Sequence, residues 1–293
     1  MKILVLGRKG QLGCCLADQL SDTAHDVIYT SRAEIEIGDL AATKEKISII
    51  NPSVVINATA YTAVDKAEDN QQVADLINHL AVANLANICN QLGCWLVHVS
   101  TDYVFDGLSS RPYQEDDRTN PQGVYGDTKL KGEKAIQASG CKHLILRTAW
   151  VFSAYGNNFL KTMLLLGADR DELRIVGDQI GCPTYAQDIA GSIVTMLPSL
   201  ESGTLTSGVL HYCGDSPVSW FEFAQEIFSE ARKLGLKTPS LLHSIETSAY
   251  PTPAARPAYS VLDCSKITAN FGIHSSDWRQ GIRLVLGNLQ SQN

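Results

Sequence analysis

A tyrosine and a lysine stand four residues apart in the segment YGDTK, residues 125–129. If this segment is helical, both side chains lie on one face and can act on one site. An ammonium group beside a phenol favours the phenolate, so Lys129 is expected to lower the pKa of Tyr125 and make it a better acid–base catalyst near neutral pH. A tyrosine and a lysine at this spacing also occur by chance on many helix surfaces, so the pair needs support from its surroundings.

A hydroxyl-rich segment supplies that support. The apolar run 95–99 is typical of a strand, and it leads directly into Ser100 and Thr101. In an open α/β sheet, ligands bind at the carboxyl ends of the strands. Ser100 and Thr101 could simply cap a turn, but that explanation accounts for only one hydroxyl. We therefore predict that Thr101, Tyr125 and Lys129 form a catalytic hydroxyl–phenol–ammonium triad.

Three glycines close to the amino terminus indicate a binding site for a dinucleotide. The segment GRKGQLG, residues 7–13, follows the first apolar run and opens a helix expected at 11–20. Glycines allow a tight turn and a close approach of the backbone, so a pyrophosphate can sit on the free N–H groups of the helix N-terminus. An ordinary strand–helix turn can carry the same pattern, but the position directly after the first strand favours dinucleotide binding through Gly7, Gly10 and Gly13.

The end of the second expected strand bears on the choice between NADH and NADPH. An acidic residue there holds the ribose 2′-hydroxyl of NAD, whereas a basic residue can hold the 2′-phosphate of NADP. This chain has Arg32 at that point and no acidic residue before Glu34. Arg32 could equally be a solvated loop residue. Both cofactors therefore stay open, with Arg32 tilting the choice weakly toward NADPH.

Short apolar runs alternate with longer amphipathic stretches through the first half of the chain. The runs expected to be strands are 3–6, 25–29, 53–56, 95–99 and 143–146, and the stretches expected to be helices are 11–20, 69–92 and 125–138. Strands that alternate with helices predict a parallel sheet covered on both faces. Right-handed crossovers then give an α/β fold with a Rossmann-like doubly wound parallel sheet.

The alternation loosens after about residue 150. Loops rich in Gly, Pro and Ser appear at 177–183, 201–208 and 250–257. We therefore expect a dinucleotide-binding domain over residues 1–150 and a smaller C-terminal substrate-binding lobe built mainly from 151–293. A helix expected at 184–197 lies in a segment, 184–200, that is predicted to return to the first domain.

The composition argues against several other classes of protein. Among 293 residues, 24 Lys and Arg stand against 31 Asp and Glu, and the net charge of −7 argues against nucleic acid or a membrane surface as a partner. The first residues, MKILVLGRKGQLG, lack the long apolar stretch of a signal peptide or membrane span. The eight cysteines form no CxxC pair, so reduced, mostly buried thiols in a cytoplasmic protein are expected.

Ten segments spread over nearly the whole chain carry a resemblance to a known family. They are GRKGQLG (7–13), GDL (38–40), NATAYTAVDKAE (57–68), STDYVFDG (100–107), NP (120–121), YGDTK (125–129), RTAWVF (147–152), NNFLKTM (157–163), DQIGCPT (178–184) and RP (256–257). The chain resembles the extended short-chain dehydrogenase/reductases, in particular members that reduce a dTDP-linked 4-keto-6-deoxysugar. The segments 57–68 and 100–107 are far more specific to those members than the glycine loop or the Tyr/Lys pair.

The resemblance implies which residues hold the ligands. Those expected along the cofactor are Gly7, Gly10, Gln11, Leu12, Gly13, Asp39, Leu40, Ala60, Tyr61, Thr62, Val99, Tyr125 and Lys129. Those expected to meet the sugar nucleotide are Thr101, Asp102, Tyr103, Trp150 and Arg256. Arg256 is a candidate for the diphosphate, because a guanidinium presents a fork of donors. Trp150 and Arg256 can equally be a core aromatic residue and a surface ion-pair partner.

The implied reaction is an NAD(P)H-dependent reduction, the last step of dTDP-rhamnose biosynthesis. Nicotinamide C4 is expected to deliver hydride to the C4 carbonyl of dTDP-4-dehydro-β-L-rhamnose, and Tyr125 to protonate the resulting alkoxide. Three alternatives stay open: a reductase of another nucleotide-linked 4-keto-6-deoxysugar, a sugar epimerase that retains its cofactor, and a non-catalytic regulatory subunit on the same fold. The complete triad of Thr101, Tyr125 and Lys129 favours catalysis.

One position departs from the family pattern. Some members bind magnesium at a dimer interface through a glutamate of the first helix, and the matching residue here is Cys15, with Cys14 before it. A thiol is a poor ligand for a hard cation that prefers oxygen. We therefore expect no metal site, and a homodimer, if one forms, that is not bridged by magnesium.

Overall fold

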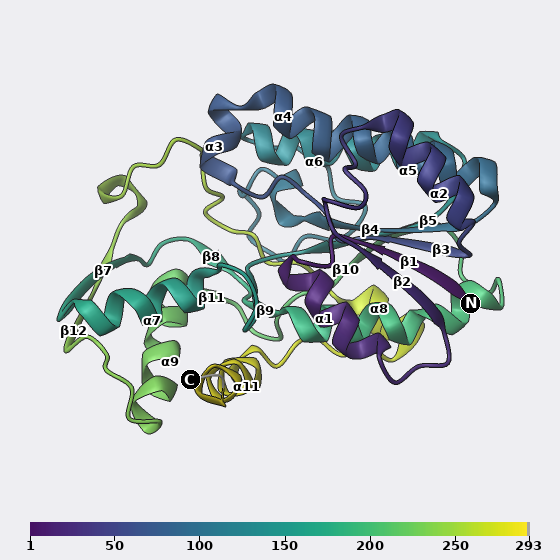
Figure 1. The fold of residues 1–293 in the computed structure, drawn as a ribbon. Coiled ribbons are helices and arrows are strands. Elements are labelled where there is room, and N and C mark those ends of the chain that lie inside the picture. Colours follow the sequence, from purple (N-terminus) through teal and green to yellow (C-terminus); the bar gives the residue numbers. More distant parts are fainter. Residues whose placement is uncertain (292–293) are drawn as a thin grey trace.

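A parallel sheet of six strands lies at the centre of the computed structural model, which describes residues 1–291 (Figure 1). Its strands are β1 (Lys2–Leu6), β2 (Asp26–Thr30), β3 (Val54–Asn57), β4 (Trp95–Thr101), β5 (Lys142–Thr148) and β10 (Gly208–His211). They lie in the order β10-β5-β4-β3-β1-β2, and every adjacent pair is parallel. Helices cover both faces of such a sheet, so its strands can be apolar on both sides, as the run 54–56 is.

Two layers of helices enclose the sheet (Figure 1). The helices α1 (Gln11–Leu20) and α8 (Ala186–Glu201) lie on one face, and α2 (Leu40–Ile50), α5 (Ala81–Leu92) and α6 (Val124–Ala138) lie on the other. Successive side chains of β1 enter opposite layers, because Ile3 packs in the core with α1 and α8 while Leu4 packs in the core with α2 and α5. This arrangement confirms the predicted α/β fold with a Rossmann-like doubly wound sheet.

Most elements predicted for the first half are present, with ends shifted by a few residues, and the long helical stretch predicted over 69–92 is continuous from Gln71 but contains a π turn. The chain there forms α3 (Val64–Asp69), α4 (Gln71–Asp75), a π-helical turn (Leu76–Leu80) and then α5. The helix α2 has no counterpart among the predicted elements. It begins after Asp39, whose carboxylate accepts a hydrogen bond from the Ala42 amide at 3.0 Å and so caps the helix.

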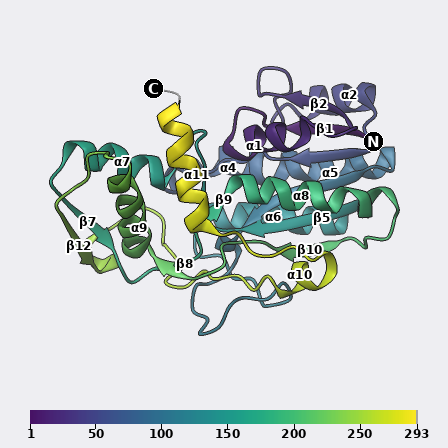
Figure 2. The same cartoon turned by 90° about the horizontal axis from the view of Figure 1, so that it is seen from below.

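A smaller lobe stands at one end of the sheet, and α11 runs between the two parts (Figure 2). Its main elements are α7 (Phe159–Asp169), α9 (Trp220–Lys233), α11 (Trp278–Ser291) and the parallel pair β7 (Glu172–Val176) and β12 (Leu241–Ile245). The remaining short elements are β6 (Val151–Phe152), β8 (Ile180–Gly181), β9 (Thr184–Tyr185), β11 (Val218–Ser219), α10 (Ser265–Phe271) and 3-10 turns at Asp102–Val104 and Thr247–Ala249. The lobe has its own core, in which Phe152, Phe223, Phe228 and Trp278 are fully buried.

Two late segments lie with the sheet rather than with the lobe. The helix α8 shares a hydrophobic core with α1, and β10 pairs with β5 at the sheet edge. The division into 1–150 and 151–293, with 184–200 returning, stays a prediction that the packing of α8 supports. The strand β10 adds residues 208–211 to the segments that return.

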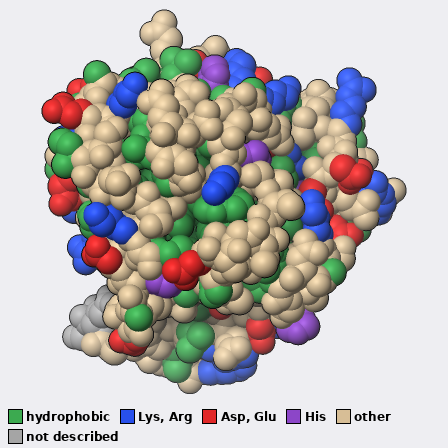
Figure 3. Space-filling view, turned by 90° about the vertical axis from the view of Figure 1, so that its right-hand side faces the viewer, with side chains coloured by type: hydrophobic (Ala, Val, Ile, Leu, Met, Phe, Trp, Pro, Cys, Tyr) green, Lys and Arg blue, Asp and Glu red, His purple; other side chains and the backbone are tan. Residues whose placement is uncertain are grey.

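The surface carries both signs of charge. On the face seen in Figure 3, basic and acidic side chains lie interspersed, with smaller hydrophobic groups between them. Within residues 1–291, no helix is both long enough and apolar enough to cross a membrane.

Candidate active site

A cleft of about 580 Å³ opens at the carboxyl ends of the central strands. Ligands of open α/β sheets bind at this edge, because the loops that follow the strands converge there. The predicted site residues that line it are Gly10, Gln11, Leu12, Ala60, Thr62, Val99, Thr101, Asp102, Tyr103, Tyr125, Lys129 and Trp150. The structure therefore brings the predicted triad, the glycine loop and part of the predicted substrate site into one cavity.

Some of the other predicted residues lie outside the cleft, where they determine the conformation of the glycine loop or begin a helix. Gly7 has a φ of +91°, which glycine adopts without strain. A Cβ atom at Gly13 would lie only 2.1 Å from the carbonyl oxygen of Gly7, so the first turn of α1 can approach the loop only with glycine at that position. Asp39 caps α2, and Leu40 is the first residue of that helix, so their expected contact with adenine stays a prediction.

The helix α6 carries both Tyr125 and Lys129 and is held closely against its neighbours. A Cβ atom at Gly126 would lie 2.2 Å from a carbonyl oxygen of the 3-10 turn after β4, so glycine is needed for this approach. Further along, Glu133 of α6 accepts a hydrogen bond from Arg147 of β5, with 2.7 Å between Oε2 and Nη2. Both side chains are buried, and this ion pair fixes α6 to the sheet beneath the cleft.

The ammonium group of Lys129 points to the strand below it rather than to Tyr125. Its Nζ donates a hydrogen bond to the carbonyl oxygen of Val99 at 2.7 Å and lies 3.2 Å from Nε2 of His98. The side chain is 2% exposed, and this burial lowers its pKa to about 8. Lys129 is therefore fixed in place by β4 and loses its proton more readily than an exposed lysine does.

His98 connects Lys129 to the neighbouring strand. Asn57 accepts a hydrogen bond through Oδ1 from the Thr59 amide at 3.1 Å, which leaves its amide nitrogen 3.0 Å from His98 Nδ1. Burial, followed by the nearby charge of Lys129, lowers the pKa of His98 well below its usual value, so the ring is neutral. An amide nitrogen can only donate, so the Asn57 amide nitrogen donates to Nδ1 of this ring.

The expectation that Lys129 lowers the pKa of Tyr125 is wrong. Burial dominates and raises the pKa of Tyr125 to about 12, and hydrogen bonding by Thr101 opposes this only in part. The ammonium group of Lys129 is engaged with β4 and does not face the phenol. The ring of Tyr125 packs edge-on against Tyr103, with 5.5 Å between the centroids. The phenol is thus a group that keeps its proton through the neutral range.

Thr101 and Asp102 form a buried pair at the end of β4. The Thr101 hydroxyl donates to Asp102 Oδ1 at 2.8 Å and accepts from the Tyr103 amide at 3.2 Å. The second carboxylate oxygen of Asp102 is buried without a hydrogen bond of ordinary geometry among the described residues, although the Ser260 hydroxyl lies near the carboxylate. Burial raises the pKa of Asp102 to about 6. An acceptor left unpaired at the edge of a cleft is a position where a ligand hydroxyl can donate.

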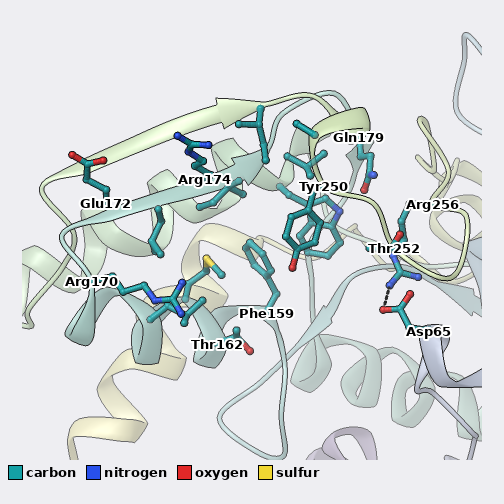
Figure 4. A pocket seen from close by; sticks show the side chains of 18 residues that line it. Asp65, Phe159, Thr162, Arg170, Glu172, Arg174, Gln179, Tyr250, Thr252 and Arg256 are labelled. Atoms are coloured by element: carbon teal, nitrogen blue, oxygen red, sulfur yellow. Dashed lines mark hydrogen bonds and ion pairs between the residues drawn. The ribbon is translucent and has the colours of Figure 1, made fainter.

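Arg256 lies in a second cavity, of about 760 Å³, which residues of the lobe line together with Asp65 of α3 (Figure 4). Its Nη2 donates to Asp65 Oδ2 at 2.7 Å, while its Nη1 is buried without a partner in the described chain. Two further arginines, Arg170 and Arg174, line this pocket together with Tyr250 (Figure 4). Arg256 thus forms an ion pair with Asp65, as one of the two predictions for it had it, and its Nη1 is a donor left unpaired beside the cavity.

Trp150 stands at the wall between the two cavities. It lines the cleft, whereas Trp220 lines the lobe pocket, and the two indole rings stack with 3.5 Å between centroids and 6° between planes. Trp150 has a φ of +47°, which is uncommon for a bulky side chain. One face of Trp150 is covered by Trp220, so the predicted packing of this indole on a sugar can use only its other face.

Several residues of the site have weak signals in the sequence. Asn78 accepts from the Tyr61 amide at 2.8 Å and donates to the Tyr61 carbonyl at 3.1 Å, so it holds the loop that carries Ala60 and Thr62. It lies in the π-helical turn, which no proline or glycine marks in the sequence. His98 has a clearer signal, because it is a polar residue inside an apolar strand.

The fold and the site define a class of protein. A doubly wound parallel sheet, a glycine loop after its first strand, and a Tyr/Lys helix beside the strand ends are the parts of an extended short-chain dehydrogenase/reductase. The family of the RmlD substrate binding domain matches residues 1–291, and the chain belongs to this family.

Several relatives of this chain are named dTDP-4-dehydrorhamnose reductase. The dTDP-4-dehydrorhamnose reductase of Escherichia coli K12 is 39% identical over 293 residues, which cover 99% of this chain and 98% of that protein. The crystal structure of a dTDP-4-dehydrorhamnose reductase from Clostridium acetobutylicum is 37% identical, covers 99% of this chain and 100% of that one, and has a TM-score of 0.92. The enzyme of the same name from Bacillus anthracis, solved in complex with NADP, is 32% identical with a TM-score of 0.91, over 98% of this chain and 99% of that one.

Proposed function

We propose that this chain reduces the C4 keto group of dTDP-4-dehydro-β-L-rhamnose to dTDP-β-L-rhamnose with NAD(P)H, the last step of dTDP-rhamnose biosynthesis. The observation that carries this proposal is the convergence of Thr101, Tyr125, Lys129 and the glycine loop on one cleft. The relatives named dTDP-4-dehydrorhamnose reductase support the choice of sugar.

The residues around the glycine loop suit a dinucleotide. Gly10 precedes α1 and provides no side-chain cap, so the first N–H groups of this helix are free for a pyrophosphate. Gln11 and Leu12 line the same end of the cleft, and Val99 and Lys129 line its floor. When bound there, the nicotinamide supplies the hydride that the reaction needs.

Tyr125 is the proposed proton donor. With its pKa raised to about 12, the phenol stays protonated at neutral pH and is ready to give its proton to an alkoxide, which is the stronger base. Lys129 is proposed to hold the nicotinamide ribose from α6, with its Nζ held in place by β4. Thr101 and Asp102 are proposed to hold the sugar, with the unpaired oxygen of Asp102 accepting from a sugar hydroxyl.

The nucleotide half of the substrate is proposed to bind in the lobe pocket. Arg256 offers a buried, unpaired Nη1 to a diphosphate, and charge-assisted hydrogen bonds of this kind are strong. Phe159 and Tyr250 provide aromatic surface in the same cavity (Figure 4). The stacked Trp150 and Trp220 form the wall between this pocket and the cleft, and the substrate is proposed to extend past this wall from one cavity into the other.

The reaction is tested by incubating the purified protein with dTDP-4-dehydrorhamnose and NADPH, then NADH, and following the loss of reduced-nicotinamide absorbance. Tyr125→Phe is expected to lower kcat by about 10²- to 10⁴-fold, because it removes the proton donor. Its affinity for NADPH is expected to be retained. Tyr155→Phe is the matched control, since Tyr155 lies outside the cleft and only donates a hydrogen bond to Asp18, at 2.9 Å. Near-normal turnover of Tyr125→Phe would overturn the assignment.

Each alternative predicts a different result in the same assay. A protein that binds cofactor but oxidises none of it with this sugar is a reductase of another 4-keto-6-deoxysugar, or a regulatory subunit if no such sugar is reduced. Nucleotide that remains bound through purification indicates an epimerase.

The proposal includes a cytoplasmic location. All eight cysteines are free thiols and seven of them are buried, as in proteins of a reducing compartment. Cys15 is among the buried ones, and burial raises its pKa to about 12, so it stays a neutral thiol. This supports the prediction that magnesium does not bridge a dimer at this position.

A further inference from the structure

The segment between β6 and α7 borders the cleft beside the glycine loop. Residues 156–158 line the cleft, as Gln11 of the glycine loop does, and α7 follows them directly. In α7, Phe159 and Thr162 border the lobe pocket instead (Figure 4). One continuous stretch of chain therefore borders both cavities.

The side chain of Asn158 connects the two ends of this stretch. Its Oδ1 accepts a hydrogen bond from the Lys161 amide at 3.1 Å and so caps α7. Its Nδ2 donates to the Ser153 carbonyl at 2.8 Å and to Oε1 of Gln11 at 2.9 Å. A backbone amide can only donate and a backbone carbonyl can only accept, so Lys161 and Ser153 fix which end of the Asn158 amide faces Gln11.

The orientation of the Gln11 side chain follows from this contact. Because Nδ2 of Asn158 is a donor, the atom of Gln11 that it meets is the acceptor Oε1, and the Ser153 hydroxyl lies 3.0 Å from the same oxygen. A Cβ atom at Gly156 would lie 3.0 Å from Cγ of Gln11, so the segment packs closely along this side chain. With Oε1 held by the segment, Nε2 of Gln11 is left to donate to a ligand in the cleft.

Capping of α7 alone does not require this second contact. A serine or threonine hydroxyl caps a helix as well as an asparagine does, and Ser219 caps α9 in the same lobe. A hydroxyl that accepts from the Lys161 amide is too short to reach Gln11. The amide of Asn158 supplies an acceptor to α7 and a donor to the glycine loop at the same time.

We propose that Asn158 is a positioning residue that aligns Gln11 with the cofactor and links the cofactor site to the lobe pocket. A pyrophosphate oxygen bound by Gln11 holds this side chain on Asn158, and Asn158 holds the first turn of α7, which borders the lobe pocket. Each ligand is therefore expected to raise the affinity for the other, by the same factor in both directions. The inference rests on the cofactor and the nucleotide substrate of the proposed function, but not on the chemistry at Tyr125.

Two ligands that do not react with each other, NADP⁺ and dTDP, test the link without any turnover. Titration calorimetry gives the affinity for dTDP in the free protein and in protein saturated with NADP⁺. The ratio of these two affinities measures the link. The wild type is expected to bind dTDP about fivefold more tightly when NADP⁺ is present. A wild-type ratio of one overturns the proposal.

Asn158→Ser separates the two contacts of this side chain, because a serine can cap α7 but cannot reach Gln11. It is expected to lower the affinity for NADP⁺ about fivefold and to bring the ratio close to one. Its affinity for dTDP in the free protein is expected to stay within about twofold of the wild type. Asn158→Ala removes the cap as well, so of these two variants only Asn158→Ala should lower the midpoint of urea unfolding. An unchanged midpoint in Asn158→Ser shows that this variant is folded.

Ser219→Ala is the matched control, because it removes a helix cap in the same lobe that has no contact with the glycine loop. It is expected to lower the midpoint of urea unfolding and to keep the affinity for NADP⁺. A loss of NADP⁺ affinity as large as that in Asn158→Ser would show an effect of lobe stability and contradict the link.

Gln11→Ala tests whether Asn158 acts through Gln11. In the wild-type background Asn158→Ser should lower the affinity for NADP⁺ about fivefold, but in the Gln11→Ala background it should change that affinity by less than about twofold. An equal loss in both backgrounds, or a wild-type ratio in Asn158→Ser, overturns the proposal.

The outcomes also separate this proposal from the proposed function. Wild-type protein that binds neither NADP⁺ nor dTDP contradicts both. The expected ratios in a protein that reduces no keto-sugar support the link and contradict the reductase. Normal reduction of the sugar together with an unchanged ratio in Asn158→Ser contradicts the link alone.

Discussion

Asp102 is a buried carboxylate that the protein only partly satisfies. It is 3% exposed, Thr101 donates to one of its oxygens, and the other has no hydrogen bond of ordinary geometry among the described residues. Burial raises its pKa from 3.8 to about 6, so the folded chain binds this proton more tightly than the unfolded chain. The free energy of unfolding therefore falls as the pH rises from about 4 to about 6, by about 3 kcal/mol from this group. Such a residue is retained at the expense of stability, which fits a role in binding.

Asp102→Asn is expected to raise the free energy of unfolding at pH 7 by about 2 kcal/mol, because an amide is neutral and can still accept from Thr101. Urea unfolding at intervals between pH 4 and pH 7 measures this change. The free energy of unfolding of the variant should depend less on pH than that of the wild type. Asp106→Asn is the matched control with the opposite sign, since hydrogen bonds from Tyr113 and from the Leu108 amide lower the pKa of Asp106. A variant at position 102 that is less stable than the wild type at pH 7 contradicts the account.

The π-helical turn is the element on which the cofactor loop depends. Asn78, 1% exposed, pairs with both backbone groups of Tyr61 and donates to Thr128 of α6 at 3.2 Å. A π turn shifts the register of a helix by one residue, and such turns are frequent at functional sites. Here the shifted register places one amide side chain between the loop after β3 and the helix that carries Tyr125.

Asn78→Leu is expected to weaken NADPH binding by about tenfold and to lower the free energy of unfolding by about 2 kcal/mol, because it leaves two backbone groups of Tyr61 unpaired. Titration calorimetry and urea unfolding measure the two effects. For Asn78→Asp both effects should be intermediate between those of the wild type and Asn78→Leu, because a carboxylate can accept from the Tyr61 amide but cannot donate to the Tyr61 carbonyl. Asn70→Leu is the control, because the side chain of Asn70 donates only to the Lys66 carbonyl, at 2.9 Å, and does not contact this loop. Equal NADPH affinities in Asn78→Leu and the wild type would exclude the role.

Elements could be predicted from sequence where local pattern determines them. The apolar runs gave the strands β1 to β5, because a strand buried on both faces must be apolar along its length. The π turn at 76–80 could not be predicted, because no local pattern marks it and its Asn78 contacts Tyr61 and Thr128, which are distant in sequence. The segment 40–50 was missed for a related reason: it has few buried residues, and its start depends on the cap provided by Asp39.

The candidate site divides in the same way. The cleft contains the predicted Tyr125 and Lys129, since residues four apart on a helix stay together wherever the helix packs. The pKa of Tyr125 could not be predicted, because it depends on burial and on the direction of the Lys129 side chain.

At the scale of the whole molecule, the cleft and the lobe pocket adjoin at the stacked rings of Trp150 and Trp220. The same two rings connect the sheet domain to the lobe. Trp150 follows β5 of the sheet, and Trp220 begins α9 of the lobe. Their stacking closes the wall between the cleft and the lobe pocket, and the left-handed backbone of Trp150 is a strain that this packing sustains. The substrate proposed here spans both cavities, whereas the cofactor needs only the cleft. The stack should therefore matter to one ligand and not to the other.

Trp220→Ala is expected to weaken dTDP binding by about tenfold while NADPH binding stays within about twofold, because it removes the partner that holds Trp150 and a wall of the lobe pocket. Calorimetry with each nucleotide measures the two affinities separately. Trp95→Ala is the matched control: Trp95 is 7% exposed at the opposite end of β4, so its loss lowers the free energy of unfolding, by about 3 kcal/mol, without touching either cavity. If both tryptophan variants lower both affinities in equal proportion, the effect is one of general stability and the stack does not couple lobe to cleft. If only Trp220→Ala lowers the affinity for dTDP and spares that for NADPH, the two stacked indoles link substrate binding in the lobe to the reaction in the cleft.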